Sequence, residues 1–264
     1  ARYVADGGDP AFGIVELAED GAGHPDSIAA ITGDPLAGPV NYTGQRLLLD
    51  DVRLVSPVIP RSKVIGIGRN YAAHAAELNN PVPDAPLLFI KPNTAVIGPG
   101  EPIVYPPETE NLHFEGELAV VIGRICRRVP RDRAAEVIFG YTVGNDITAR
   151  DLQTSDKQWA RAKGFDSFCP LGPWIVTHLS LDEASDLQVT TTVNGELKQD
   201  GRTSDMVQGI AELIEYVSGF TTLLPGDVIL TGTPAGVGPL QPGDQVAVTV
   251  EGIGTLTNPV VAEN

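Results

Sequence analysis

The sequence predicts a β-rich α+β fold. Apolar segments of strand length are separated throughout the chain by turn-forming residues. The 29 glycines and 22 prolines are scattered rather than clustered, which is typical of many tight turns between short strands. The predicted strands outnumber the predicted helices and do not alternate with them regularly, so a doubly wound parallel sheet is not expected.

Most of the predicted elements are strands. We expect strands over residues 63–68, 87–91, 113–122, 138–146, 228–231 and 245–250. A short helix is expected over residues 71–78. The clearest helix is predicted over residues 206–218, because Met206, Ile210, Leu213 and Val217 recur at helical spacing. Ser204 or Asp205 would cap the start of this helix.

The chain is expected to fold as two domains, a small N-terminal one over residues 1–57 and a larger one over residues 58–264. In the first 57 residues, short apolar segments are divided by loops that contain glycine, aspartate and proline. Pro57 and Pro60 then favour extended backbone and exclude a helix. The segment around these two prolines is therefore the predicted junction.

Charge and composition limit the function. With 18 basic and 34 acidic residues, the net charge is −16, which argues against nucleic acid or an anionic membrane as a partner. No apolar segment approaches the roughly 20 residues of a membrane span, and the N-terminus has no signal-peptide pattern. The two cysteines match no zinc spacing, so we expect free thiols in a cytoplasmic protein. An anionic substrate would need local positive charge, which a bound cation could supply.

Three carboxylates form the candidate metal site. Glu115 and Glu117 are two residues apart in a predicted strand, so they share a face and repel each other unless a cation lies between them. Alone, this pair could equally be the solvated face of an edge strand, and Asp146 could belong to an ordinary Asn-Asp turn. Together the three offer an all-oxygen ligand set, which favours Mg²⁺, with Mn²⁺ or Ca²⁺ possible. Zinc is not favoured, because no cysteine or histidine cluster accompanies them.

From Lys63 to about Val261 the sequence resembles the fumarylacetoacetate hydrolase superfamily, in particular its bacterial 2-hydroxyhepta-2,4-diene-1,7-dioate isomerases and acylpyruvate hydrolases. The matching blocks are Gly68-Arg-Asn-Tyr-Ala-Ala-His74, Phe89-Ile-Lys-Pro92, Glu115-Gly-Glu-Leu-Ala-Val-Val-Ile-Gly123, Gly144-Asn-Asp-Ile-Thr-Ala-Arg-Asp151, Lys163-Gly-Phe-Asp166, Pro170-Leu-Gly-Pro173, Leu230-Thr-Gly-Thr-Pro-Ala-Gly-Val-Gly238 and Glu251-Gly-Ile-Gly254. The resemblance implies a mixed β-sandwich roll over residues 58–264, a homodimer, and Mg²⁺ or Mn²⁺ held by Glu115, Glu117 and Asp146.

The resemblance also implies roles for other residues. His74 and Glu77, three residues apart on the short helix, correspond to a general base and its orienting acid on a mobile lid, although such a pair is often only surface decoration. Lys163 would hold a substrate carboxylate or a developing enolate. We interpret Lys91 as structural. The remaining residues expected to bind substrate are Arg69, Asn70, Gln153, Gly232 and Thr233.

The expected substrate is a small 2-oxo acid that chelates the metal, which stabilises an enolate. Hydrolysis of an acylpyruvate or isomerisation of 2-hydroxyhepta-2,4-diene-1,7-dioate would follow from this intermediate. Decarboxylation or tautomerisation of oxaloacetate is the alternative, because it needs the same metal and the same enolate. A non-catalytic metal-binding protein on the same scaffold is a third possibility, since a fold does not determine a function.

Overall fold

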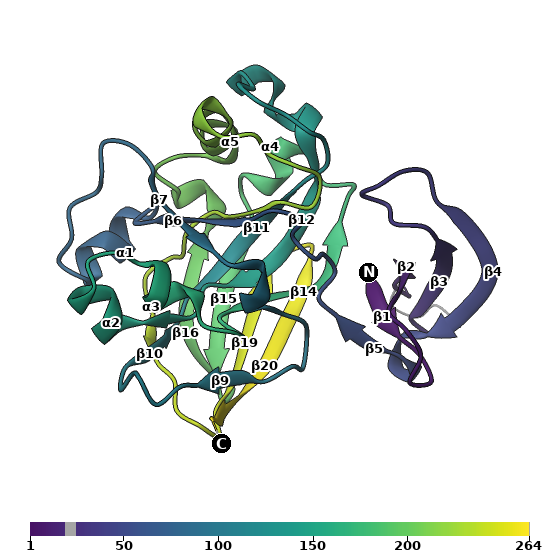
Figure 1. The fold of residues 1–264 in the computed structure, drawn as a ribbon, viewed down its shortest axis with the longest axis horizontal. Helices are drawn as coiled ribbons and strands as arrows, with labels where there is room; N and C mark the ends of the chain where they lie inside the picture. Colours follow the sequence, from purple (N-terminus) through teal and green to yellow (C-terminus); the bar gives the residue numbers. More distant parts are fainter. Residues whose placement is uncertain (19–24, 264) are drawn as a thin grey trace.

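The computed structural model describes residues 1–18 and 25–263. A small sheet near the N-terminus lies beside a larger β-rich body (Figure 1). The small sheet has the strand order β4-β3-β2-β1-β5 and is antiparallel throughout. Its strands are β1 (Arg2–Val4), β2 (Ala11–Glu16), β3 (Ser27–Thr32), β4 (Asn41–Leu48) and β5 (Arg53–Val55).

The larger body is built on three sheets. Its central sheet has seven strands in the order β7-β6-β17-β11-β12-β14-β8, a second sheet has the order β16-β15-β19-β20-β9, and a third has the order β13-β10-β18. The strands of the central sheet are β6 (Val64–Gly68), β7 (Leu87–Lys91), β8 (Val96–Ile97), β11 (Gly116–Ile122), β12 (Ile138–Asn145), β14 (Cys169–Val176) and β17 (Val228–Leu230). The other strands are β9 (Ile103–Tyr105), β10 (Leu112–Phe114), β13 (Thr148–Ala149), β15 (Gln188–Val193), β16 (Glu196–Arg202), β18 (Gly238–Pro239), β19 (Gln245–Val250) and β20 (Gly254–Ala262).

Both parallel and antiparallel pairs occur in this body. The pairs β6·β17, β8·β14 and β9·β20 are parallel, and the other pairs in the three sheets are antiparallel. Strand accounts for 41% of the structure and helix for 19%, so the predicted β-rich class is confirmed.

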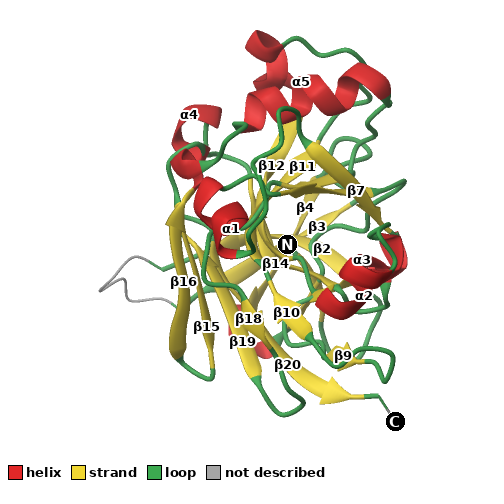
Figure 2. Ribbon diagram, turned by 90° about the vertical axis from the view of Figure 1, so that its left-hand side faces the viewer, coloured by secondary structure: helices red, strands yellow, loops and turns green. Residues whose placement is uncertain are grey.

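Helices are short and lie around the sheets (Figure 2). The α-helices are α1 (Ala72–Glu77), α2 (Arg150–Ser155), α3 (Ala160–Gly164), α4 (Leu181–Ala184) and α5 (Ile210–Phe220), and the 3₁₀ turns are η1 (Leu49–Asp51), η2 (Asn93–Ala95), η3 (Arg131–Val137) and η4 (Thr203–Asp205). None of the helices in the described ranges is long and apolar enough to cross a membrane.

Strand β11 lies at the centre of the core. All seven of its residues are buried. Leu118, Val120 and Ile122 belong to the large apolar cluster that also contains the inner face of α5, whereas Ala119 and Val121 belong to a second cluster on the other side of the sheet. A strand covered on both faces reads as a continuous apolar run, as this one does.

The helix expected over residues 206–218 begins later than predicted. Helix α5 starts at Ile210, with Gly209 and not Ser204 or Asp205 as its N-cap residue. Met206 instead has extended backbone and forms a β-bridge with Tyr71. These tertiary contacts override the helical pattern before Ile210, while the predicted apolar stripe from Ile210 onward is buried as expected.

The strand expected over residues 113–122 is interrupted. Strand β10 ends at Phe114 and strand β11 begins at Gly116, so Glu115 lies between two strands of different sheets. A Cβ atom at Gly116 would come within 2.2 Å of the Thr191 hydroxyl oxygen, so only glycine allows β11 to begin this close to β15.

Asp227, directly before β17, ties this strand to the start of β6. Its carboxylate is fully buried and accepts hydrogen bonds from the backbone and hydroxyl of Ser62 and from the backbone of Lys63 and Leu224. The Lys63 ammonium lies 2.7 Å from the carboxylate. The parallel pair β6·β17 thus begins at a carboxylate whose every oxygen has partners.

The Asp227→Asn change is predicted to lower the free energy of unfolding by about 2–4 kcal/mol. The amide NH₂ group would face N–H and O–H groups that now donate to the carboxylate, and the Lys63 ammonium would lose its counter-charge. Urea unfolding would measure the loss. The same carboxylate-to-amide change at Glu136, whose ion pair with Arg133 is exposed to solvent, should cost much less. Equal losses in the two variants would contradict this account.

Candidate active site

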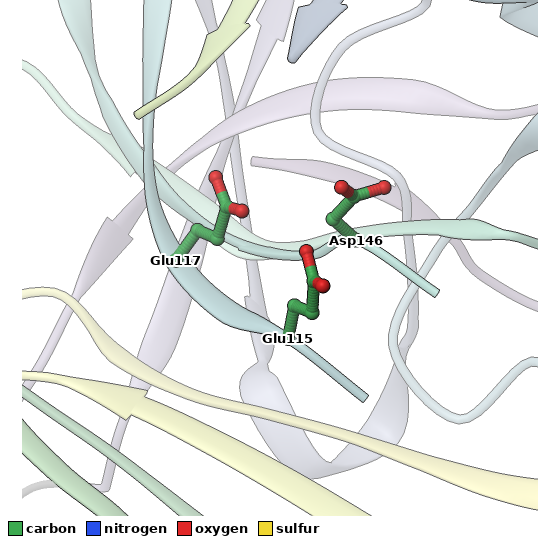
Figure 3. A group of neighbouring side chains, drawn as sticks. All are labelled: Glu115, Glu117 and Asp146. Atoms are coloured by element: carbon green, nitrogen blue, oxygen red, sulfur yellow. The ribbon is translucent and has the colours of Figure 1, made fainter. Parts of the chain in front are cut away.

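Three carboxylates meet at one end of the β11·β12 pair. These two strands are antiparallel, with Gly116 opposite Asn145. The backbone N–H of Glu115 donates to the Asn145 side chain at 2.9 Å, and the backbone N–H of Asp146 donates to the Glu115 carbonyl at 2.9 Å. The register therefore brings Asp146 beside Glu115 and Glu117. Figure 3 shows the three side chains extending into a common space.

These carboxylates are close together and buried. Oxygen atoms of Glu115, Glu117 and Asp146 lie within 4.8 Å of one another, and the three residues are 5%, 1% and 1% exposed. Glu115 and Glu117 were expected on the same face of one continuous strand, which is wrong. The structure brings the two together differently, because Glu115 lies in the break between β10 and β11.

Three cationic side chains surround the cluster. Lys163 lies 2.9 Å from Glu115 and also contacts Asp146. Lys91 contacts Asp146, and Arg150 contacts Glu115. Lys91 is fully buried and Lys163 is 2% exposed. Three buried positive charges thus face three buried negative ones.

Lys91 and Arg150 were not among the residues proposed from the sequence for this chemistry. Both belong to the sequence blocks that resemble the family, Lys91 before Pro92 and Arg150 four residues after Asp146. Their position in those blocks was the available signal. Their partners are 55 and 35 residues away in the chain, so no local spacing reveals the contacts.

The three cationic side chains pair with Glu115 and Asp146 but not with Glu117. Burial raises the pKa of Glu115, but Arg150 and Lys163 outweigh it and hold the pKa well below its usual range. Glu117 forms no ion pair within the described part of the chain, and its one hydrogen-bond donor is the backbone N–H of Gly232 at 2.7 Å. Burial and the neighbouring charges of Asp146 and Glu115 raise the pKa of Glu117 well above its ordinary value. This all-oxygen set with one unneutralised carboxylate fits a hard divalent cation.

A cavity of about 270 Å³ opens beside the cluster. Its wall includes Arg150 and six of the residues proposed from the sequence. These six are Arg69, His74, Glu115, Gln153, Lys163 and Thr233. Trp159 also lines it, and the Lys163 ammonium lies 4.7 Å from the centre of the Phe89 ring and 5.9 Å from that of Trp159. Aromatic faces on this side hold the ammonium toward the carboxylates.

The His74–Glu77 pair lies on α1, the short helix that was expected here. His74 is 5% exposed, and its Nδ1 atom lies 3.5 Å from a Glu77 carboxylate oxygen, without a hydrogen bond to any residue described. Burial lowers the pKa of His74 below its ordinary value of 6.5, against the opposing effect of Glu115. The imidazole is therefore neutral at neutral pH. Glu77 also accepts hydrogen bonds from the backbone N–H of Gly236 at 3.1 and 3.2 Å.

Asn70 and Gly232 are not part of the cavity wall. The Asn70 amide donates to the carbonyls of Gln208 and Thr231 at 3.0 and 2.8 Å, and its oxygen accepts from the Gln208 backbone at 2.9 Å. Gly232 has a φ of 100° and donates to Glu117. A Cβ atom there would lie 2.7 Å from the Asn70 Cβ atom. Both residues therefore hold the backbone behind Glu117, and a direct contact with substrate stays a prediction.

Comparison with known proteins agrees with this architecture. Residues 63–261 match the family model described as fumarylacetoacetate hydrolase C-terminal, and residues 1–57 match one described as Rv2993c-like, N-terminal. The chain belongs to the fumarylacetoacetate hydrolase family. Members of this family include isomerases, hydrolases and tautomerases, so the chain is an enzyme at the family level.

Three relatives show the range of activities in the family. A solved 5-carboxymethyl-2-hydroxymuconate delta-isomerase from Mycobacterium smegmatis is 53% identical, with a TM-score of 0.89 over 99% of this chain and 98% of that one. A fumarylpyruvate hydrolase from Pseudomonas aeruginosa, solved with Mn²⁺ and pyruvate, is 35% identical, with a TM-score of 0.73 over 78% of this chain and 91% of that one. A mitochondrial oxaloacetate tautomerase from Bos taurus is 44% identical over 80% of this chain and 70% of its own length.

Opposite effects are predicted for two carboxylate-to-amide changes in metal-free protein. Glu117→Gln should raise stability at neutral pH, because folding disfavours ionisation of this carboxyl group, whereas the amide has no charge to lose and keeps an acceptor for Gly232. Asp146→Asn should lower the free energy of unfolding by about 3–5 kcal/mol, because Lys91 and Lys163 lose their shared counter-charge. Urea unfolding in a chelator measures both changes. Destabilisation of similar size in both variants would show that Glu117 is neutralised in some other way.

Proposed function

We propose that this chain is a divalent-metal-dependent enzyme that forms an enolate from a small 2-oxo acid. The observation that carries the proposal is the convergence of Glu115, Glu117 and Asp146 within 4.8 Å, buried beside a cavity that a neutral imidazole also lines. Glu117 supports it most directly, since a buried carboxylate without an ion pair is costly unless a cation binds there. Mg²⁺ or Mn²⁺ suits the ligand set best.

The mechanism assigns a task to each group. Bound at the three carboxylates, Mg²⁺ or Mn²⁺ would act as a Lewis acid toward the carboxylate and keto oxygens of a 2-oxo acid. His74, neutral and on the cavity wall, would accept a proton from the attacking water in hydrolysis, or from the carbon next to the keto group in isomerisation or tautomerisation, with Glu77 orienting its ring. The Lys163 ammonium would stabilise negative charge that develops on the substrate. The surrounding core keeps bulk water away from these charges.

The cavity wall favours a substrate with a second carboxylate. Arg69 is half-buried and lines the cavity, and its guanidinium group has neither a hydrogen bond nor an ion pair with any residue described. A half-buried cation without a partner is best satisfied by an anionic ligand. Arg69 would then bind the far carboxylate of a diacid, such as an acylpyruvate with an acidic side chain or a dienedioate.

Hydrolysis of an acylpyruvate-type C–C bond, or isomerisation of 2-hydroxyhepta-2,4-diene-1,7-dioate, is the reaction we favour. Both need a base close to the substrate, and His74 supplies one. Tautomerisation of oxaloacetate is the second candidate, supported by the bovine relative, which bears the name of that activity. Oxaloacetate is also a diacid and would meet the same Arg69.

Titration calorimetry and a substrate panel test the proposal together. Mn²⁺ should bind one site per chain, and the Glu117→Gln variant should bind it at least about tenfold more weakly, as expected when one ligand is lost. Acylpyruvates, dienedioates and oxaloacetate should then be consumed only with Mg²⁺ or Mn²⁺, and diacids faster than matched monoacids. Metal binding without turnover of any member of the panel would indicate a non-catalytic binding protein. Turnover in a chelator would refute the role of the metal.

A role for His74 as general base predicts a specific pH profile. Because burial lowers its pKa, kcat/KM should be flat around neutral pH and fall only below 6.5, where the imidazole takes up a proton. The cation would lower this pKa further and move the fall in the same direction. His74→Ala should reduce acylpyruvate hydrolysis by about 10²–10⁴-fold and remove the inflection. Oxaloacetate decarboxylation should suffer less, because it needs no activated water. Equal losses would assign His74 to binding or lid closure.

A further inference from the structure

Gln199 is a fully buried polar residue on β16, outside the cavity and outside the carboxylate cluster. Its side-chain oxygen accepts a hydrogen bond from the backbone N–H of Gly116 at 3.0 Å. Its side-chain nitrogen donates to the Thr233 hydroxyl at 2.7 Å and to the Pro234 carbonyl at 2.8 Å. One amide thus joins the start of β11 to the loop after β17.

These contacts close a ring around the Gly116 peptide. The Thr233 hydroxyl accepts from Gln199 and donates to the Gly116 carbonyl at 2.8 Å. Gly116 lies between Glu115 and Glu117, so its backbone orientation determines where both carboxylates point. Because the Thr233 hydroxyl already donates its proton to the Gly116 carbonyl, this cavity-wall hydroxyl can act toward a ligand only as an acceptor.

The same loop holds the helix that carries His74. The backbone N–H of Gly236 donates to both carboxylate oxygens of Glu77 on α1. The loop approaches β16 so closely that a Cβ atom at Gly236 would lie 2.1 Å from the Lys198 carbonyl oxygen. Pro234 also leaves space only for glycine at Gly201, where a Cβ atom would lie 2.5 Å from the proline ring.

We propose that Gln199 is a positioning residue that couples the placement of the candidate metal-binding carboxylates to the anchoring of α1. It fixes Gly116 between the two glutamates, and through Thr233 and Pro234 it fixes the loop whose Gly236 binds Glu77. The inference rests on the proposed function for its metal-binding half only. The half that concerns α1 depends on hydrogen bonds among described residues and can be tested without metal.

The test replaces Gln199 by methionine, which has a similar shape and cannot form these three bonds. In metal-free protein, amide hydrogen exchange over residues 72–77 and 233–236 should become at least about tenfold faster, because both segments lose their anchor. In the same variant the dissociation constant for Mn²⁺ should rise about 10–100-fold, the usual effect of removing a residue that orients ligands. Exchange over α5 should not change.

Two controls separate positioning from general loss of stability. Thr191→Val also alters a buried polar side chain beside Gly116, but this hydroxyl has no hydrogen-bond partner among the residues described, so exchange and Mn²⁺ affinity should stay at wild-type values. Asp227→Asn should lower stability while leaving Mn²⁺ affinity unchanged. Wild-type exchange over residues 72–77 and 233–236 in Gln199→Met would overturn the proposal. Wild-type Mn²⁺ affinity in that variant would overturn it equally, whereas absence of Mn²⁺ binding in the wild-type chain would refute the proposed function itself.

Discussion

Repulsion among three buried carboxylates is the constraint that the rest of the site must satisfy. Charges removed from water are tolerated only when they are paired and hydrogen-bonded. Glu115 and Asp146 meet this condition through Lys91, Lys163 and Arg150, which approach from β7, α3 and α2. The helices beside the cavity are therefore needed for the charge balance of the sheet, and not only as a cover for it.

Burial of β11 on both faces strengthens the repulsion among the carboxylates and also shifts the pKa values of groups at the site. Apolar clusters on the two sides of the central sheet exclude water from the strand that leads to Glu117. Electrostatic interactions are stronger in such surroundings than in water. The same exclusion of water raises the pKa of Glu117 and lowers the pKa of His74. Glu117 therefore favours a bound cation, and His74 stays neutral and can act as a base. Both shifts therefore have their origin in the packing of the sheets.

The sequence predicted the elements whose side chains alternate or repeat clearly. Strands β6, β7, β12, β17 and β19 and helix α1 lie close to their predicted ranges. Strand β14 was missed because it contains Pro170 and Pro173, and β16 was missed because six of its seven side chains are polar or absent and it shows no apolar alternation. The one fully buried side chain of β16 is that of Gln199, so no apolar pattern could indicate that this residue supports the site.

The residues of the candidate site were predictable to the extent that the motif blocks contain them. The three carboxylates were named from the sequence and lie together, as do His74, Lys163 and three further residues of the cavity wall, Arg69, Gln153 and Thr233. Sequence spacing could not reveal that Asn70 binds backbone, because its partners Gln208 and Thr231 are 138 and 161 residues away. Nor could it reveal the contacts of Lys91 and Arg150, which depend on how distant segments pack.

Charge at the site resolves the difficulty that the net charge of −16 poses for an anionic substrate. Three carboxylates and three cationic groups cancel within the cluster, and Arg69 adds a positive charge to the wall. Under the proposed function, a divalent cation makes this region strongly positive, and a chelating diacid then brings it back toward neutrality. Neither ligand alone leaves the buried charges balanced. Metal and substrate should therefore bind cooperatively, because each reduces the electrostatic cost of holding the other in a site that excludes water.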